Sequence, residues 1–185
     1  MSNFSELTFL NLNGNLLREK NSVELKYNSK LETLDLAENS IRNLNVLNIS
    51  DTPIKKLRLN QNLLYSELDF TNFDSLTELN LDDNKLTSLP IMPANLEVLR
   101  LNDNQLKSSN VIFPPLKLKE IHLAGNHMAQ LSNIAFANLK YIKFVALSGN
   151  NFTTANGFIL PTDQTSEQFG LEPPMSIHYW QKLCR

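Results

Sequence analysis

The chain has 185 residues, of which 42% are hydrophobic and 19% are charged. This balance fits one folded domain or one short repeat array and argues against disorder. The net charge of −2 provides no general attraction to nucleic acid or anionic membranes. No apolar run approaches the roughly 18 residues that a membrane span requires, so we expect no membrane insertion.

The first 15 residues contain no basic region followed by an apolar run, so we expect no secretory signal peptide. The single cysteine, Cys184, allows no intrachain disulfide. It favours a reducing compartment, or a fold that needs no cross-links. The sequence therefore predicts a cytosolic location.

One spacing of apolar residues recurs seven times between residues 7 and 152. In the copy at residues 96–106, LEVLRLNDNQL, leucines occupy positions 1, 4, 6 and 11, and an asparagine occupies position 9. The pattern is identified as that of the leucine-rich repeat. Successive asparagines are 20 to 24 residues apart, within the period of that repeat. They are Asn15, Asn39, Asn62, Asn84, Asn104, Asn126 and Asn150.

The spacing has a direct physical meaning. Positions 4 and 6 leave the same face of a strand and point into the core, whereas positions 3, 5 and 7 point outward. The asparagine follows where the strand turns, and its amide can satisfy backbone groups that the turn leaves unpaired. Stacked copies should therefore form a structural ladder of asparagines.

We predict an α/β fold, a curved leucine-rich-repeat solenoid with a parallel β-sheet on its concave face. Short helical or irregular segments should form the convex face. Residues 1–152 should hold the array of about seven repeats, and residues 153–185 should form a C-terminal cap or tail.

The connections between strands differ more than the strands do. Residues 88–95 contain two prolines and should be extended. Residues 133–142 have few helix breakers and should form a helical turn. Residues 69–76 and 110–118 should be irregular turns that bring Phe73 and Phe113 into the core.

The two ends need capping, because terminal repeats would otherwise expose the core. Six residues precede the first copy, with Phe4 as the candidate cover. Near the other end, Met175, Tyr179 and Leu183 recur at i, i+4 and i+8 after two prolines, which predicts a short amphipathic helix. The alternative is a free tail that binds a partner.

The sequence contains no catalytic motif of the phosphate-loop, zinc-protease, nucleophile-elbow or dinucleotide-binding type. His122 and His127 are five residues apart across a turn, which is poor metal-ligand geometry. We expect no metal and no cofactor. The chain should be a binding protein or an inhibitor, not an enzyme.

The outward positions on the concave face are the candidate partner-binding residues. They mix acidic, basic and apolar side chains, which favours a folded protein partner over nucleic acid. The alternative is a solvated face that keeps the sheet soluble, and the chain alone should be monomeric. The candidates are Phe9, Asn11, Thr33, Asp35, Lys56, Arg58, Glu78, Asn80, Asp82, Val98, Arg100, Asn102, Glu120, His122 and Phe144.

Two stretches resemble known subfamilies. The spacing Leu89-Pro90-x-Met92-Pro93-x-x-Leu96 is similar to the linkers of leucine-rich-repeat effectors that bacteria inject through type III or type IV secretion. That resemblance implies a module in the host cytoplasm that binds a host protein or another effector, as an adaptor or an inhibitor. This chain departs from those effectors, since a single linker matches, no N-terminal helical cap precedes the repeats, and no ubiquitin-ligase domain follows them.

The second stretch, LETLDLAENSIRNL at residues 31–44, resembles the repeats of intracellular eukaryotic scaffolds that regulate phosphatases or associate with splicing. This resemblance implies the alternative function, an intracellular scaffold or regulatory subunit.

Overall fold

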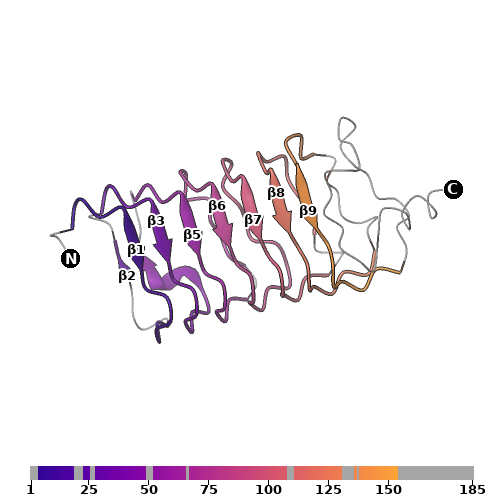
Figure 1. Ribbon diagram of the computed structural model, residues 1–185, viewed down its shortest axis with the longest axis horizontal. Coiled ribbons are helices and arrows are strands. Elements are labelled where there is room, and N and C mark those ends of the chain that lie inside the picture. The colour runs from indigo at the N-terminus through magenta and orange to yellow at the C-terminus, as the bar shows by residue number, and fades with distance from the viewer. Residues whose placement is uncertain are drawn as a thin grey trace.

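The computed structural model describes residues 4–18, 23–25, 28–48, 52–65, 67–107, 111–130, 136 and 138–153. Seven three-residue strands form one parallel sheet whose spatial order follows the chain order (Figure 1). The predicted solenoid with a parallel sheet is confirmed. The strands are β1 (Phe9–Asn11), β3 (Thr33–Asp35), β5 (Lys56–Arg58), β6 (Glu78–Asn80), β7 (Val98–Arg100), β8 (Glu120–His122) and β9 (Phe144–Ala146).

All neighbouring strands pair in the same register. In β6 and β7, for example, Glu78 faces Val98, Leu79 faces Leu99, and Asn80 faces Arg100. Each repeat position therefore becomes a row across the sheet, with strands about 4.8 Å apart. The central residue of each strand points into the core, and its two neighbours point outward.

The core lies between the sheet and the connecting segments. Leu99 and Leu101, at positions 4 and 6 of one repeat, are both fully buried. Aromatic rings from the connections complete the core: Phe113 stacks on Phe136 with ring centroids 5.6 Å apart. Phe73 is also buried, so the connections fill the space beneath the sheet.

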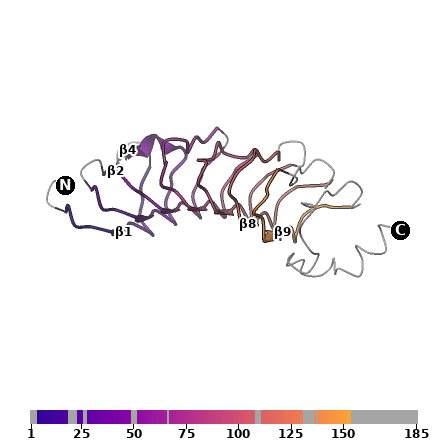
Figure 2. The ribbon, with the colours of Figure 1, turned by 90° about the horizontal axis from the view of Figure 1, so that it is seen from above.

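The convex side is irregular almost throughout the described residues. Its one described helical segment is the 3-10 turn η1 (Leu44–Val46). Two short strands, β2 (Val23–Glu24) and β4 (Leu47–Asn48), pair in parallel on the side opposite the main sheet (Figure 2). The sequence did not indicate this second sheet, because two-residue strands carry no readable alternation.

The proline-rich segment at residues 88–95 contains Ile91, which forms an isolated parallel bridge with Asp69 of the preceding repeat. The helical turn predicted over residues 133–142 lies partly outside the described residues. Where that segment is described, it contains a turn in which the N–H of Leu139 donates to the carbonyl of Phe136 at 2.8 Å.

Six asparagines make the same set of hydrogen bonds. The amide nitrogen of Asn104 donates to the carbonyls of Leu101 (3.3 Å) and Asn102 (3.1 Å) in its own turn. It also donates to Leu81 of the previous repeat at 3.0 Å, and its oxygen accepts the N–H of Leu86 at 3.0 Å. The same bonds recur at Asn39, Asn62, Asn84, Asn126 and Asn150. Each asparagine thus ties its turn to the preceding repeat.

The residue before each of these asparagines, and before Asn15, has a positive φ. Gly125 has a φ of +62°, and a Cβ there would lie 2.1 Å from an oxygen of Asp103. A side chain at this position would be strained by the left-handed backbone and would have to displace the Asp103 carboxylate, so glycine suits it best. Non-glycine residues adopt the same left-handed conformation in four repeats, at Glu38, Gln61, Asp83 and Asp103.

The first repeat is only partly covered by the described residues. Phe4 is 57% exposed and Leu16 is 82% exposed, while Leu10 and Leu12 are half-buried. Apart from Thr153, the predicted C-terminal cap or tail at residues 153–185 lies outside the described residues, as does its predicted helix.

We expect Asn104→Ala to lower the free energy of unfolding by about 1–3 kcal/mol, because a buried N–H and a buried carbonyl lose their partner. Asn15 provides the matched control, since it is exposed and, among the described residues, its amide bonds only within its own turn, to Leu12 and Asn13. Asn15→Ala should therefore change the free energy of unfolding by no more than about 0.5 kcal/mol. Urea unfolding followed by circular dichroism measures both. Equal losses in the two variants would show that the bonds between repeats carry no special weight.

Candidate functional site

The outward side chains of the seven strands, with those at position 7 just beyond each strand, form one continuous surface, here called the strand face. Fourteen of the fifteen residues predicted to bind a partner are exposed or half-exposed on it. Phe9 is 48% exposed at the N-terminal end of this face. Val98 and Phe144 are half-buried, so each presents part of an apolar side chain to solvent.

Asp35 differs from the rest, because it is only 6% exposed. Its two oxygens are already engaged: one accepts the N–H of Ala37 at 3.1 Å, and the other binds Arg58 at 3.1 Å. The long arginine side chain from the next strand lies beside the shorter aspartate. Asp35 therefore positions Arg58 and offers little surface of its own.

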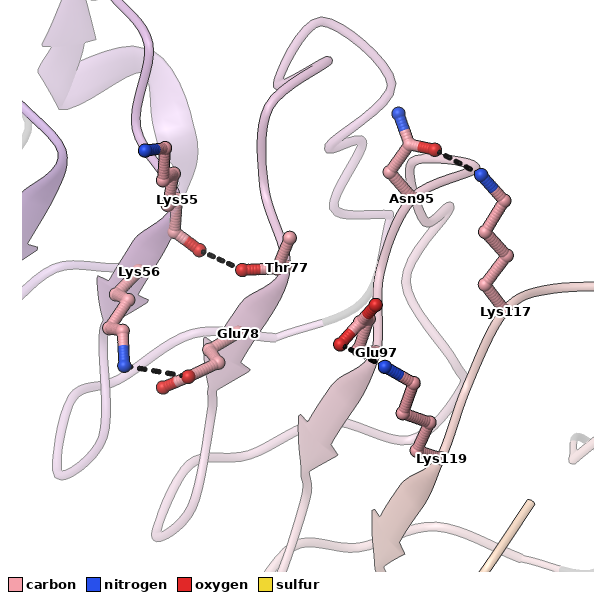
Figure 3. Close-up of polar contacts among 8 residues, drawn as sticks. All are labelled: Lys55, Lys56, Thr77, Glu78, Asn95, Glu97, Lys117 and Lys119. Carbon is pink, nitrogen blue, oxygen red and sulfur yellow. Dashed lines mark hydrogen bonds and ion pairs between the residues drawn. The ribbon is translucent and has the colours of Figure 1, made fainter. Parts of the chain in front are cut away.

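Several charges on the strand face, and others just before its strands, pair with an opposite charge on a neighbouring repeat. Lys56 of β5 lies 2.7 Å from Glu78 of β6, and Lys119 lies 2.7 Å from Glu97 one repeat away (Figure 3). The side chains of these pairs are 38–48% exposed. Each pair is therefore worth at most about 1 kcal/mol, and the main effect is to neutralise the surface locally.

Arg100 of β7 does not follow this pattern. One of its guanidinium nitrogens lies 3.3 Å from Nε2 of His122, a contact that forms when the imidazole is neutral and Nε2 accepts. No carboxylate forms an ion pair with Arg100 among the described residues. Its positive charge is the least compensated on the central strands.

The surroundings of His122 keep it neutral. Burial lowers the pKa of His122 below its ordinary value of 6.5, and the positive charge of Arg100 lowers it further. Glu120 opposes both effects through a weak contact at 3.7 Å. On the other side the ring of Phe144 lies 4.9 Å away, centroid to centroid.

Side-chain oxygens at the ends of the central strands bond to backbone N–H groups. Oδ1 of Asn80 accepts the N–H of Asp82 at 2.9 Å. A carboxylate oxygen of Asp82 accepts the N–H of Asn102 at 2.6 Å, and Oδ1 of Asn102 accepts the N–H of Ala124 at 2.9 Å. Burial raises the pKa of Asp82, and the bonds from Asn102 and the charge of Arg100 oppose that rise.

A shallow hollow of about 140 Å³ opens over the centre of strands β5 to β7. Arg58 and Arg100 stand on its two sides, with Asn80 between them in the register of the sheet. Its lining is basic on balance, with three cations and one carboxylate. The lining residues are Lys56, Leu57, Arg58, Glu78, Leu79, Asn80, Val98 and Arg100.

Within the described ranges, no three histidine, cysteine or acidic side chains come together as a metal site would require. No described helix has the length and apolar character needed to cross a bilayer.

Comparison with known proteins agrees with this geometry. The family model described as Leucine Rich Repeat matches residues 75–94. A solved leucine-rich-repeat protein of Leptospira interrogans superposes with a TM-score of 0.63 at 26% identity, covering 81% of this chain and 39% of that protein. The fold is a leucine-rich-repeat solenoid. A plant peptide hormone receptor, RGFR1 in complex with RGF2, also matches with a TM-score of 0.55 at 28% identity, over 77% of this chain and 24% of the receptor.

Curated relatives have similar repeats. Lumican of Bos taurus is 33% identical over 160 residues, which cover 68% of this chain and 47% of lumican. Toll-like receptor 2 of Ovis aries is 29% identical over 159 residues, which cover 80% of this chain and 19% of the receptor. This leucine-rich-repeat chain thus spans less than half the length of the curated relatives it matches.

We expect Arg100→Gln to raise the pKa of His122, because a positive charge beside the imidazole is removed. In the wild-type protein the folded state resists protonation of His122, so its contribution to stability should be present above pH 6.5 and decline as the pH falls below that value. The variant should lose less stability on acidification. Nuclear magnetic resonance (NMR) titration of the His122 ring measures the pKa, and urea unfolding at two pH values measures the stability.

Glu120→Gln is the opposite control for this titration. It removes the hydrogen bond and the negative charge that favour protonation, so the pKa of His122 should fall. An unchanged or lowered pKa in Arg100→Gln would contradict the role assigned to Arg100.

Proposed function

We propose that this chain is a non-enzymatic binding module that holds a folded protein partner on the strand face. The observation that carries the proposal is the make-up of that face: paired charges surround partly exposed apolar side chains on one continuous sheet. A face that served only for solubility would have no use for Phe9, Val98 and Phe144 pointing outward.

The rigidity of the surface supports the same proposal. Backbone hydrogen bonds and the asparagine bonds between repeats hold every strand in place. Ion pairs such as Lys56–Glu78 already order the side chains before a partner arrives. Binding to such a face costs little side-chain entropy, because the contacting groups are preorganised.

The mixed charges favour protein over nucleic acid. Nucleic acid requires a broad positive field that neutralises many phosphates. Acidic side chains lie among the lysines and arginines, so no such field develops: Glu78 and Glu120 stand on the face, and Glu32 and Glu97 stand just before its strands. A partner with complementary patches of both signs suits the face better.

The similarity to a plant receptor whose structure contains RGF2, and to Toll-like receptor 2, supports a role in binding a partner. We further propose that the partner is a host protein or another effector, so that the module serves bacteria as an adaptor or an inhibitor. The linker at residues 89–96 and the similarity to a Leptospira protein support this setting. The alternative is an intracellular scaffold or regulatory subunit, which rests on the resemblance of residues 31–44.

Two matched substitutions in neighbouring segments test the strand face. Val98→Arg places a bulky cation in the middle of the face, and we expect it to reduce partner capture at least tenfold. Ile91→Arg makes the same kind of change at a site that is 58% exposed on the opposite side, and it should leave capture intact. The measurement is quantitative mass spectrometry of proteins retained by the immobilised wild type and each variant, from extracts of the cells in which the chain occurs.

Both side chains are partly or largely exposed, so each variant should unfold at nearly the wild-type temperature, which confirms that the fold is intact. Proteins lost with Ile91→Arg but kept with Val98→Arg would place the partner on the convex side and refute the proposal. For a captured enzyme, an activity assay with and without this chain separates an inhibitor, which lowers the activity, from an adaptor, which leaves it unchanged.

A further inference from the structure

We propose that the hollow between Arg58 and Arg100 receives a single carboxylate of the partner, an aspartate or glutamate side chain seated over Asn80. This inference rests on the proposed function and names the chemistry at the centre of the strand face. It is carried by the hydrogen-bond donors that line the hollow and by their unbalanced charge.

The first part of the argument is the position of the two arginines. They stand in the same row of the sheet, on the strands either side of β6, so their Cα atoms are roughly 10 Å apart. Arg58 uses one nitrogen to bind Asp35 and Arg100 uses one to approach His122, each toward the outer side of the hollow. A guanidinium has five N–H donors, so both side chains keep donors for a ligand between them.

The second part is the orientation of Asn80. Its oxygen accepts the backbone N–H of Asp82 at 2.9 Å. The amide nitrogen, with two N–H donors, is therefore the end available to a ligand, and no described residue accepts from it. The row across the hollow thus presents donors at three successive positions, which suits an acceptor with two oxygens.

The third part is charge. Lys56 is compensated by Glu78, and Arg58 is compensated by Asp35. Arg100 has no such partner among the described residues, and its contact with His122 involves a neutral ring. Arg100 is therefore the lining cation whose guanidinium is not engaged in an ion pair within the described residues, although Asp82 lies near it, so it is the group that can still bind a monoanion.

A carboxylate fits better than a phosphate group. Glu78 lines the hollow and Asp82 lies beside Arg100. A phosphate carries close to two negative charges at neutral pH and is repelled more strongly by these acidic groups. The hollow, at about 140 Å³, is large enough for the end of one acidic side chain.

The pKa of His122 can report whether the hollow is occupied, because His122 contacts Arg100. The charged groups that face this ring are Arg100 from β7 and Glu120 from its own strand, and β9 contributes the neutral ring of Phe144. A carboxylate bound to Arg100 offsets the positive charge beside the imidazole. Occupancy of the hollow should therefore raise the pKa of His122.

The test uses blocked glutamate (acetyl-Glu-N-methylamide) as a probe, titrated into the isotope-labelled chain and followed by NMR. We expect saturable, millimolar binding, with shifts at the side-chain N–H signals of Arg58, Asn80 and Arg100 and an upward shift in the pKa of His122. Blocked glutamine, which has no charge, should produce no such shifts. Inorganic phosphate should bind several-fold more weakly, and equal or tighter phosphate binding would overturn the preference for carboxylate.

The substitutions are chosen to leave the fold intact. Arg100→Gln should weaken glutamate binding at least tenfold, and it leaves no paired carboxylate unsatisfied. Arg58→Lys keeps a cation beside the buried Asp35 but removes the planar fork, so binding should again weaken. The matched control is Arg42→Gln, because Arg42 is an exposed arginine that does not line the hollow.

Shifts that do not saturate, or that persist unchanged in Arg100→Gln, would refute the carboxylate site. If the site fails while Val98→Arg still removes the partner, the strand face remains the binding surface and only its central ligand is wrong. If glutamate binds while Val98→Arg has no effect on capture, the site exists but the proposed function is wrong.

Discussion

The structure depends on the side-chain amide of the repeated asparagine. A parallel strand of three residues makes too few backbone bonds to hold a turn in place, and the turn leaves buried carbonyl and N–H groups unpaired. Asn104 supplies both a donor and an acceptor to these groups and reaches into the preceding repeat. Because an unpaired buried polar group costs about 1–3 kcal/mol, six such residues give the stacked turns one common geometry.

Because of that common geometry, residues at the same position of successive repeats form a row across the surface of the sheet. Every outward position repeats at the spacing of the strands, so side chains some 20 residues apart become neighbours. Lys56 meets Glu78, and Lys119 meets Glu97, through this register alone. The binding properties of the strand face therefore arise between repeats and not within any one of them.

The same register also concentrates charge at the centre. Arg58 and Arg100 flank Asn80 in one row, and the charge of Arg100 reaches His122 on the next strand. The electrostatics of the hollow and the titration of His122 are consequently linked. A ligand on one arginine is felt by a side chain one strand away.

By itself the sequence determined the fold, the apolar core positions and the register. Leu99 and Leu101 are two residues apart and must share a face of the strand. The asparagine at position 9 of the repeat, which is Asn104 in one copy, recurs at a period that admits only stacking, so local spacing was sufficient. Only the tertiary structure decided that Asp35 is buried, that β2 and β4 pair, and that a hollow opens over Asn80. These features depend on which side chains from neighbouring repeats reach one another, and spacing along the chain does not contain the lengths and directions of those side chains.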